Sequence, residues 1–264
     1  MLKDITIGQY FPGQSFIHKM DPRMKIISTL LYIVMLFLAG NLMGICAGIL
    51  LLILMYQLSG IPMNMVTKSL KPVIPVVIFT SVLNIFFVSG EVLLKFFFIE
   101  ITREGINLAI LMSFRILCLI AGSSLLTYTT SPIELTDAIE RLLNPLKKLK
   151  VPVHELSMMM TIALRFIPTL IEETDKIINA QKARGADMES GGLMQRAKAL
   201  VPILIPLFVS SFRRADELAM AMECRCYRGG DGRTRMKQLQ YSHRDWIALT
   251  VMAGAIAVVL LLNV

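Results

Sequence analysis

Two arginines flanked by small residues have the type and spacing that suit recognition of carboxylates. They occur in Ala183-Arg184-Gly185 and in Cys224-Arg225-Cys226, each where a helix is expected to end. Because a helix C-terminus carries partial negative charge, a cation there is stabilised locally. Small neighbours leave the guanidinium uncovered, so its planar fork can pair with a carboxylate through two parallel hydrogen bonds. One such helix end alone is typical of a solvated helix cap. Two similar ends predict that the chain docks both arginines into a pair of similar acidic grooves on partner proteins.

The common catalytic and nucleotide-binding motifs are absent from the sequence. It contains no Gly-x-x-x-x-Gly-Lys-Ser/Thr, no Gly-x-Ser-x-Gly and no His-Glu-x-x-His. The three histidines, His18, His154 and His243, lie far apart and are interpreted as interfacial. Near Cys224 and Cys226 the only further metal ligand is His243, which is too few for tetrahedral zinc. We therefore expect no catalytic residues, no cofactor and no metal site.

Apolar helices must position the two arginines. Of the 264 residues, 55% are hydrophobic and 17% are charged, and the mean hydropathy is +0.64. A soluble domain is nearer to about a half apolar and about a quarter charged. The excess lies in uninterrupted apolar runs, which are typical of membrane-spanning helices. These runs are 26–40, 42–58, 73–89, 105–128 and 246–262.

The basic residues predict the orientation of the chain in the membrane. Most of the 27 lysines and arginines fall within 129–244, which has no clean apolar run. The excess of Lys and Arg in cytoplasmic segments places this stretch in the cytoplasm. Four preceding spans then put the N-terminus in the cytoplasm and the C-terminus outside. The net charge of +8 is thus interpreted as a topology signal rather than as a nucleic-acid-binding surface.

The stretch 129–244 is predicted to form three helices, near 132–143, 155–184 and 193–227. Ser131-Pro132-Ile133-Glu134 has the form of a capping box with proline at the first helical position. The later helices carry apolar residues at helical spacing and interior prolines, which remove backbone donors and bend helices. These prolines are Pro168, Pro202 and Pro206.

The predicted fold class is an all-α membrane protein. It has about five transmembrane helices, with long amphipathic cytoplasmic coupling helices between the fourth and the fifth. The expected parts are an N-terminal membrane domain over 1–128, a cytoplasmic coupling domain over 129–244 and a C-terminal transmembrane helix over 245–264. Arg115 falls inside the fourth run, where a charge should face protein, water or the interface; whether it is functional stays open.

Several segments of the chain resemble one known family. They are Gly8-Gln9-Tyr10-Phe11-Pro12-Gly13 with Ser15, His18-Lys19-Met20-Asp21-Pro22-Arg23-Met24-Lys25, Asn144-Pro145-Leu146 with Val151-Pro152, Arg165-Phe166-Ile167-Pro168-Thr169-Leu170, Gln181-Lys182-Ala183-Arg184-Gly185 and Glu223-Cys224-Arg225-Cys226-Tyr227-Arg228-Gly229. On these segments, which span nearly the whole chain, it resembles the transmembrane T component of energy-coupling factor (ECF) transporters. The paired arginine motifs are the most specific part of the resemblance.

The resemblance implies a coupling scaffold without catalytic activity in the cell membrane of a prokaryote. Its partners would be two ABC-type ATPase subunits and a small membrane S component that binds a vitamin or a metal ion. Arg184 and Arg225 would insert into grooves of the two ATPases, and ATP-driven closure would move the helices and reorient the S component. One departure is Cys224, where the family often has alanine; cysteine is still small, so docking should survive.

Two other classes of function remain open from the residues alone. A membrane enzyme could hold an anionic lipid or a polyprenyl phosphate on the basic surface, since such lipids favour Lys and Arg clusters beside spans. No acidic cluster for Mg²⁺ faces those basic residues in the sequence. A secondary transporter should show an inverted repeat, and four spans before the basic stretch with one after it do not form one.

Overall fold

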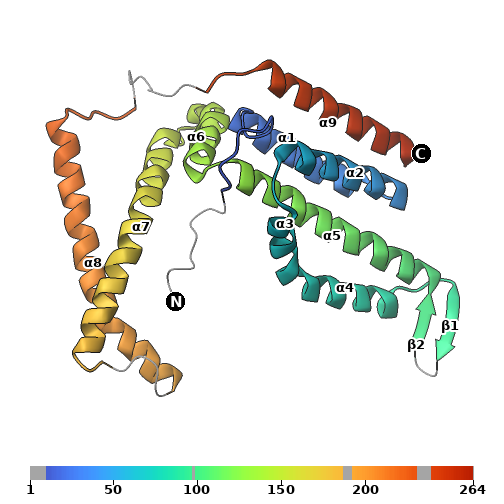
Figure 1. Ribbon diagram of the computed structural model, residues 1–264, viewed down its shortest axis with the longest axis horizontal. Coiled ribbons are helices and arrows are strands. Elements are labelled where there is room, and N and C mark those ends of the chain that lie inside the picture. The colour runs from blue at the N-terminus through green and yellow to red at the C-terminus, as the bar shows by residue number, and fades with distance from the viewer. Residues whose placement is uncertain (1–9, 97–98, 187–191, 231–238, 264) are drawn as a thin grey trace. The chain divides into compact units, whose positions relative to one another are not determined.

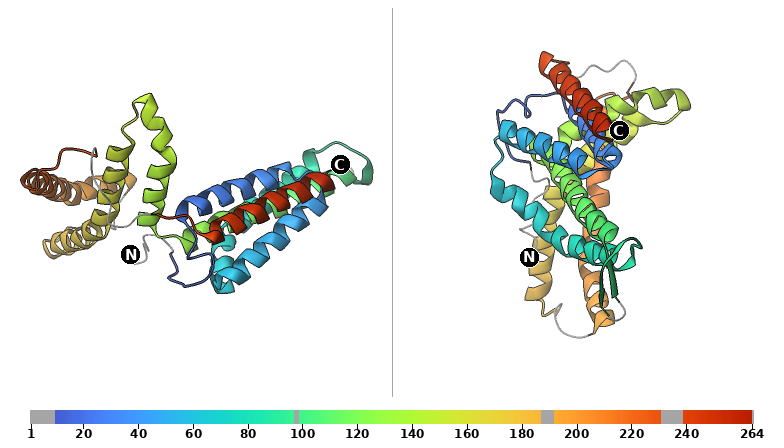
Figure 2. Two further views of the ribbon diagram at one scale, coloured as in Figure 1. Left: turned by 90° about the horizontal axis from the view of Figure 1, so that it is seen from above. Right: turned by 90° about the vertical axis from the view of Figure 1, so that its right-hand side faces the viewer.

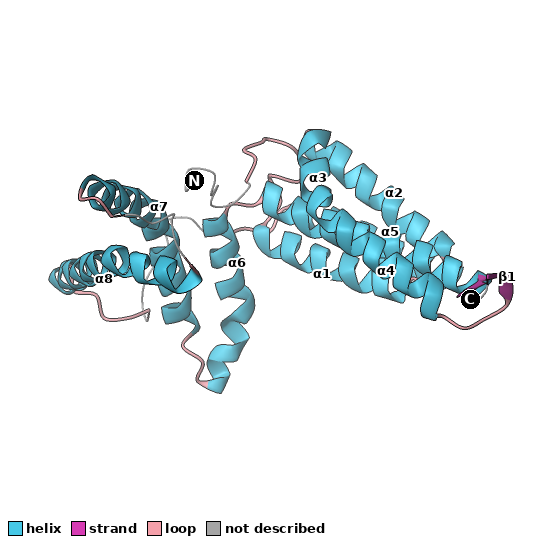
Figure 3. Ribbon diagram, turned by 90° about the horizontal axis from the view of Figure 1, so that it is seen from below, coloured by secondary structure: helices cyan, strands magenta, loops and turns pink. Residues whose placement is uncertain are grey.

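The structure, a computed structural model, describes residues 10–96, 99–186, 192–230 and 239–263. We call the segments Gly8–Gly13 and His18–Lys25 together the opening motif; its first two residues, Gly8 and Gln9, lie outside the described residues. The described chain is helical apart from one hairpin, shown in magenta in Figure 3, so the predicted all-α class is confirmed. It divides into a helix-bundle unit, Gly8–Ala138 with Lys237–Val264, and a long-helix unit, Ile139–Met236 with Met1–Ile7.

The helix-bundle unit consists of apolar helices that lie side by side (Figures 1 and 2). Its elements are α1 (Pro22–Leu38), α2 (Leu42–Ser59), α3 (Met63–Leu70), α4 (Ile74–Phe87), β1 (Val92–Phe96), β2 (Ile99–Thr102), α5 (Arg103–Thr129) and α9 (His243–Leu262). The two strands pair antiparallel and join α4 to α5. Helix α6 (Pro132–Leu143) follows α5, and the boundary between the two units falls within it.

Four helical segments of the described chain are long and apolar enough to cross a membrane. They are Leu42–Ser59, Met63–Phe87, Arg103–Thr129 and His243–Leu262. The expected run 26–40 corresponds to α1, which is shorter, at 17 residues, and has Arg23 and Lys25 in its first turn. The segment Met63–Phe87 begins before the expected run 73–89, because Pro72 lies in a short 3₁₀ helix, Lys71–Val73, between α3 and α4. At the start of that turn the missing proline N–H costs little, so the chain stays helical through it.

The core of the helix-bundle unit lies where α1, α2, α5 and α9 meet. Its buried residues are Tyr32, Met35, Leu36, Ala39, Ile45, Cys118, Met252 and Val259. Gly122 allows α5 to approach α1 closely, because a Cβ there would lie 2.6 Å from Cε1 of Tyr32. Elsewhere large apolar side chains face outward, as for Phe79 on α4, which is 63% exposed. Such outward apolar surface is what a lipid environment favours.

Arg115 is accounted for by a contact within the helix-bundle unit. Its Nη2 donates a hydrogen bond to the carbonyl oxygen of Ala39 at 2.5 Å, and Ala39 is the C-cap of α1. A cation at the negative end of a helix is favourable and satisfies a carbonyl that has no helical donor. Arg115 thus caps α1 from inside a neighbouring span.

The long-helix unit is built on two helices that lie antiparallel. A 3₁₀ helix (Asn144–Leu149) leads into α7 (Val153–Ala183), and α8 (Leu193–Cys224) follows. Pro168 lies inside α7, and both Pro202 and Pro206 lie inside α8. Figure 1 shows that α8 changes direction along its length, as expected where prolines remove helical hydrogen bonds.

Candidate functional site: two arginine helix ends

The first arginine closes α7 in a Schellman motif. Helix α7 ends at Ala183, and Arg184 is its C-cap. Gly185, with a φ of 83°, donates its N–H to the carbonyl of Lys182 at 3.0 Å, and the N–H of Ala186 reaches the carbonyl of Gln181 at 3.0 Å. This pair of bonds defines the motif and satisfies carbonyls that the helix end leaves open. Arg184 is exposed.

The second arginine closes α8 with the same hydrogen bonds. Arg225 is the C-cap after Cys224. The N–H of Cys226 donates to the carbonyl of Glu223 at 2.9 Å, and that of Tyr227 donates to the carbonyl of Met222 at 3.0 Å. Cys226 takes the left-handed position with a φ of 55°, where glycine is usual. The two arginines therefore occupy the same position in the same backbone motif.

Both ends leave the guanidinium free to meet a partner. Arg184, Arg225 and the flanking Ala183, Gly185, Cys224 and Cys226 are all exposed. Among the described residues, neither arginine has an ion pair. All four cysteines of the chain are free thiols. Each end can thus offer a planar, charged fork to an incoming carboxylate.

The structure does not bring the two arginines together. Because α7 and α8 run antiparallel, their C-terminal ends lie at opposite ends of the pair (Figure 1). The two exposed arginines are therefore separated along the length of the helix pair.

Among the described residues, polar contacts at three levels join α7 to α8 and to the residues that follow it, and sequence reasoning predicted none of them. In the middle, Arg214 donates from Nη2 to Oε2 of Glu173 at 2.7 Å. Near the end of α7, Gln181 donates from Nε2 to the carbonyl of Pro202 at 3.3 Å. Near the end of α8, the hydroxyl of Tyr227 lies 3.1 Å from Sδ of Met158.

The interior prolines explain the Gln181 contact. Pro206 has no N–H, so the carbonyl of Pro202, four residues earlier, has no helical donor. The side-chain amide of Gln181 supplies that hydrogen bond from the neighbouring helix. The spacing of Pro202 and Pro206 was the available signal, because it marks a carbonyl that needs an outside partner.

The segment after Arg225 packs against the start of α7. A Cβ on Gly230 would lie 2.4 Å from Cδ2 of His154, so this position accommodates glycine alone without a shift of the histidine. His154 in turn has its Nδ1 3.1 Å from Oε1 of Glu140 on α6. The chain beyond the second arginine is therefore held close to the first turn of α7.

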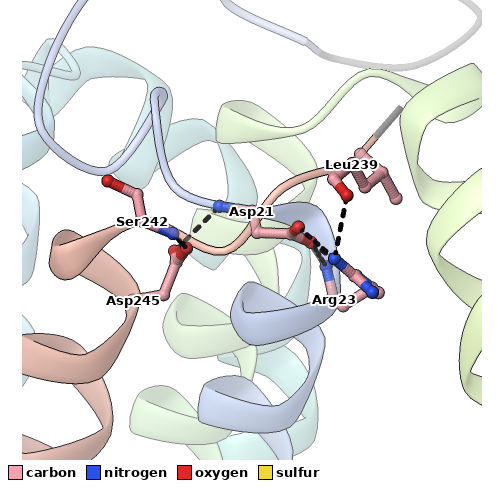
Figure 4. Close-up of polar contacts among 5 residues, drawn as sticks. All are labelled: Asp21, Arg23, Leu239, Ser242 and Asp245. Atoms are coloured by element: carbon pink, nitrogen blue, oxygen red, sulfur yellow. Dashed lines mark hydrogen bonds and ion pairs between the residues drawn. The ribbon is translucent and has the colours of Figure 1, made fainter. Parts of the chain in front are cut away.

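In the helix-bundle unit, the opening motif forms a buried polar cluster with the start of α9 (Figure 4). Oδ1 of Asp245 accepts the N–H of Asp21 at 2.9 Å, and Oδ2 accepts the N–H of Ser242 at 2.7 Å. Arg23 donates to both carboxylate oxygens of Asp21, at 3.0 and 2.7 Å. Its Nη2 also reaches the carbonyl of Leu239 at 3.4 Å. Because Asp245 is 1% exposed, these bonds fix the beginning of α9 against α1.

His18 belongs to the same opening motif and is hydrogen-bonded through both ring nitrogens. Its Nδ1 lies 2.7 Å from the Ser15 hydroxyl, and its Nε2 lies 2.9 Å from the Phe11 carbonyl. Burial lowers the pKa of His18, the bond to Phe11 opposes this shift, and the nearby charge of Lys25 adds to it. The ring therefore favours the neutral form, with Nε2–H as the donor.

Comparisons with known proteins cover almost the whole chain. The family model CbiQ, described as "Cobalt transport protein", matches residues 13–236. A relative from Clostridium kluyveri, named energy-coupling factor transporter transmembrane protein EcfT, is 60% identical over 94% of this chain and 93% of its own length. Proteins of the same name from Ruminiclostridium cellulolyticum and Bacillus subtilis are 57% and 47% identical, over 93% and 96% of this chain and 92% and 97% of their own lengths.

Proposed function

We propose that this chain couples two ATPase subunits to an S component. The premise is that the chain belongs to the CbiQ family and is a transmembrane T component of the ECF type. ATP hydrolysis on the ATPases would move α7 and α8, and this movement would reorient the S component for uptake of a vitamin or a trace metal. The chain itself would catalyse no reaction. In this proposal the N-terminus and the long-helix unit face the cytoplasm, and the C-terminus faces outward.

One observation carries the proposal: two helices end in the same Schellman motif with an exposed arginine at the C-cap. Two similar ATPase subunits would offer two similar grooves, and a shared backbone frame lets one kind of groove accept either arginine. The antiparallel arrangement supports docking of two separate subunits rather than one. A carboxylate in each groove would pair with the guanidinium through two hydrogen bonds.

The test is co-purification of the chain with the two ATPases and the S component encoded in the same genome. Arg184→Ala and Arg225→Ala should each weaken retention of the ATPases, and the double change should abolish it. Removing one partner of a buried ion pair costs about 3–5 kcal/mol. At about 1.4 kcal/mol per tenfold change, this loss is roughly two to four orders of magnitude in affinity.

A matched control removes a charge from α7 away from its end. Lys176 is exposed, and Lys176→Ala should leave ATPase retention as in the parent. If the Arg184→Ala, Arg225→Ala double variant retains both ATPases as well as the parent does, the docking proposal is wrong. Turnover of a lipid phosphate by the isolated chain would favour a membrane enzyme instead.

A further inference from the structure

A charged contact joins α7 and α8 in the middle of the antiparallel pair. Oε2 of Glu173 accepts from Nη2 of Arg214 at 2.7 Å, and Oε1 accepts from the hydroxyl of Ser210. Ser210 and Arg214 lie one helical turn apart, so both face the same side of α8. The side chains of Glu173 and Arg214 are 22% and 34% exposed, so the pair is partly shielded from water. Shielding and a second hydrogen bond distinguish this contact from an ordinary surface ion pair.

The contact lies at the same distance from both arginine ends. Glu173 precedes Arg184 by 11 residues (184 − 173), and Arg214 precedes Arg225 by 11 residues (225 − 214). We call the helical segment between the contact and each arginine an arm. At about 1.5 Å of rise per helical residue, each arm is about 16 Å long. Since the helices run antiparallel, the two arms extend in opposite directions from the contact (Figure 1).

Elsewhere along the pair, the described polar contacts of α7 with α8 and with the residues after it are weaker and lie farther from the middle. Gln181 to Pro202 is a neutral hydrogen bond at 3.3 Å in an exposed position. The Tyr227 hydroxyl lies 3.1 Å from the sulfur of Met158, a weak acceptor. A hydrogen bond between ionised groups is about twice as strong as a neutral one. In a shift of α7 against α8, we expect the outer contacts to break before the central one.

The packing beside the central contact leaves room for such a shift. An open groove of about 810 Å³ lies between α7 and α8, next to Glu173 and Arg214. The other lining residues are Phe166, Pro206, Val209, Ser210, Arg213, Glu217 and Leu218. A tightly packed helix pair resists rotation because its side chains interdigitate, and the groove reduces that resistance here.

We infer that Glu173, held by Arg214 and Ser210, is the pivot on which α7 and α8 turn against each other. The inference rests on the proposed function and assigns a positioning residue to it. With equal arms, a rotation that moves one ATPase-bound arginine end moves the other by the same amount in the opposite direction. Movement of one ATPase is thereby passed to its counterpart through a single ion pair.

The test measures the distance between the two helix ends in the complete complex. Spin labels carried by genetically encoded amino acids are placed at Ala186 and Arg228, which leaves the native cysteines and both docking arginines unchanged. The distance distribution is recorded for the chain with its two ATPases and S component, with and without a non-hydrolysable ATP analogue. In the parent, the nucleotide should shift the distribution as one population.

Loss of the pivot should reduce that shift without loss of docking. Glu173→Gln and Arg214→Gln should still co-purify with both ATPases, while the nucleotide-induced shift falls to about half or less and the distribution broadens. The charge-reversed pair, Glu173→Arg with Arg214→Glu, should restore most of the shift, which a general loss of folding would not allow. Glu172→Gln and Arg213→Gln remove the same charges from exposed neighbours and should behave as the parent.

The outcomes separate the pivot from the proposed function. If the ATPases are absent from the parent complex, the proposed function is wrong. If the ATPases bind, the pivot proposal is wrong when the distance between the two labels in the parent complex does not change with nucleotide. It is also overturned by single variants that shift as the parent does, or by a charge-reversed pair no better than the single variants.

Discussion

Cys226 holds the left-handed position of the second helix end, and replacing it with glycine should tighten that end. A residue with a Cβ in the left-handed region costs about 1–2 kcal/mol, whereas glycine carries no such strain. Glycine adds about 0.5–1 kcal/mol of chain entropy to the unfolded state, so the net gain of Cys226→Gly is about 0.5–1 kcal/mol. The opposite change at the first end, Gly185→Ala, should cost about the same. A Cβ at Gly185 would meet no atom within 4 Å, so the cost is backbone strain rather than a clash.

The assay is hydrogen–deuterium exchange of the amides that close the two Schellman motifs. A change of about 1 kcal/mol in the local opening free energy alters exchange by about fivefold. Cys226→Gly should therefore slow exchange at Tyr227 N–H severalfold, and Gly185→Ala should speed exchange at Ala186 N–H by a similar factor. Cys226→Ala removes the thiol but keeps the strained backbone, so its exchange should match that of the parent. Faster exchange in Cys226→Gly, or no change in Gly185→Ala, would refute the assignment of the Schellman geometry to these ends.

Two further predictions concern the opening motif. Asp245→Ala leaves the buried N–H of Asp21 without an acceptor, at about 1–3 kcal/mol, and it also removes the acceptor of the N–H of the exposed Ser242. It should lower the midpoint of thermal unfolding in detergent, and an unchanged midpoint would contradict the role of this cluster. Since the pKa of His18 is lowered in the folded chain, the unfolded chain binds the extra proton first as the pH falls below about 6.5. The neutral His18 ring therefore makes its full contribution to the free energy of unfolding above that pH. This contribution is lost as the pH falls through the pKa of His18 in the folded chain. His18→Gln should flatten this decline in thermal stability, and an equally steep decline would show that another group causes it.

The sequence predicted the features that depend on local chemistry. Pro132 and the capping pattern around it mark the first residue of α6, and Gly185 marks the end of α7. The left-handed cysteine at 226 could not be predicted, because propensity disfavours that conformation and only the hydrogen bonds of the end require it. The Glu173–Arg214 pair was equally inaccessible. Its partners are 41 residues apart, and charged side chains on amphipathic helices are usually solvated until the helix pairing is known.

The two arginine ends share a backbone frame but differ in how they are braced. Beyond Arg225, the Tyr227 side chain contacts Met158, and Gly230 lies against His154, so the second end is held on the start of α7 by two contacts. Beyond Arg184, the next residues are Gly185 and Ala186, which carry no side chain long enough to do the same. Within the described residues, the first end contacts α8 through the exposed hydrogen bond from Gln181 to the carbonyl of Pro202. The proposed rotation about Glu173 would have to break the contacts of Tyr227 and Gly230 as well as the Gln181 hydrogen bond. Equal segments on the two sides of the pivot make both ends travel the same distance, so the contacts beyond Arg225 resist the movement of the Arg184 end as well.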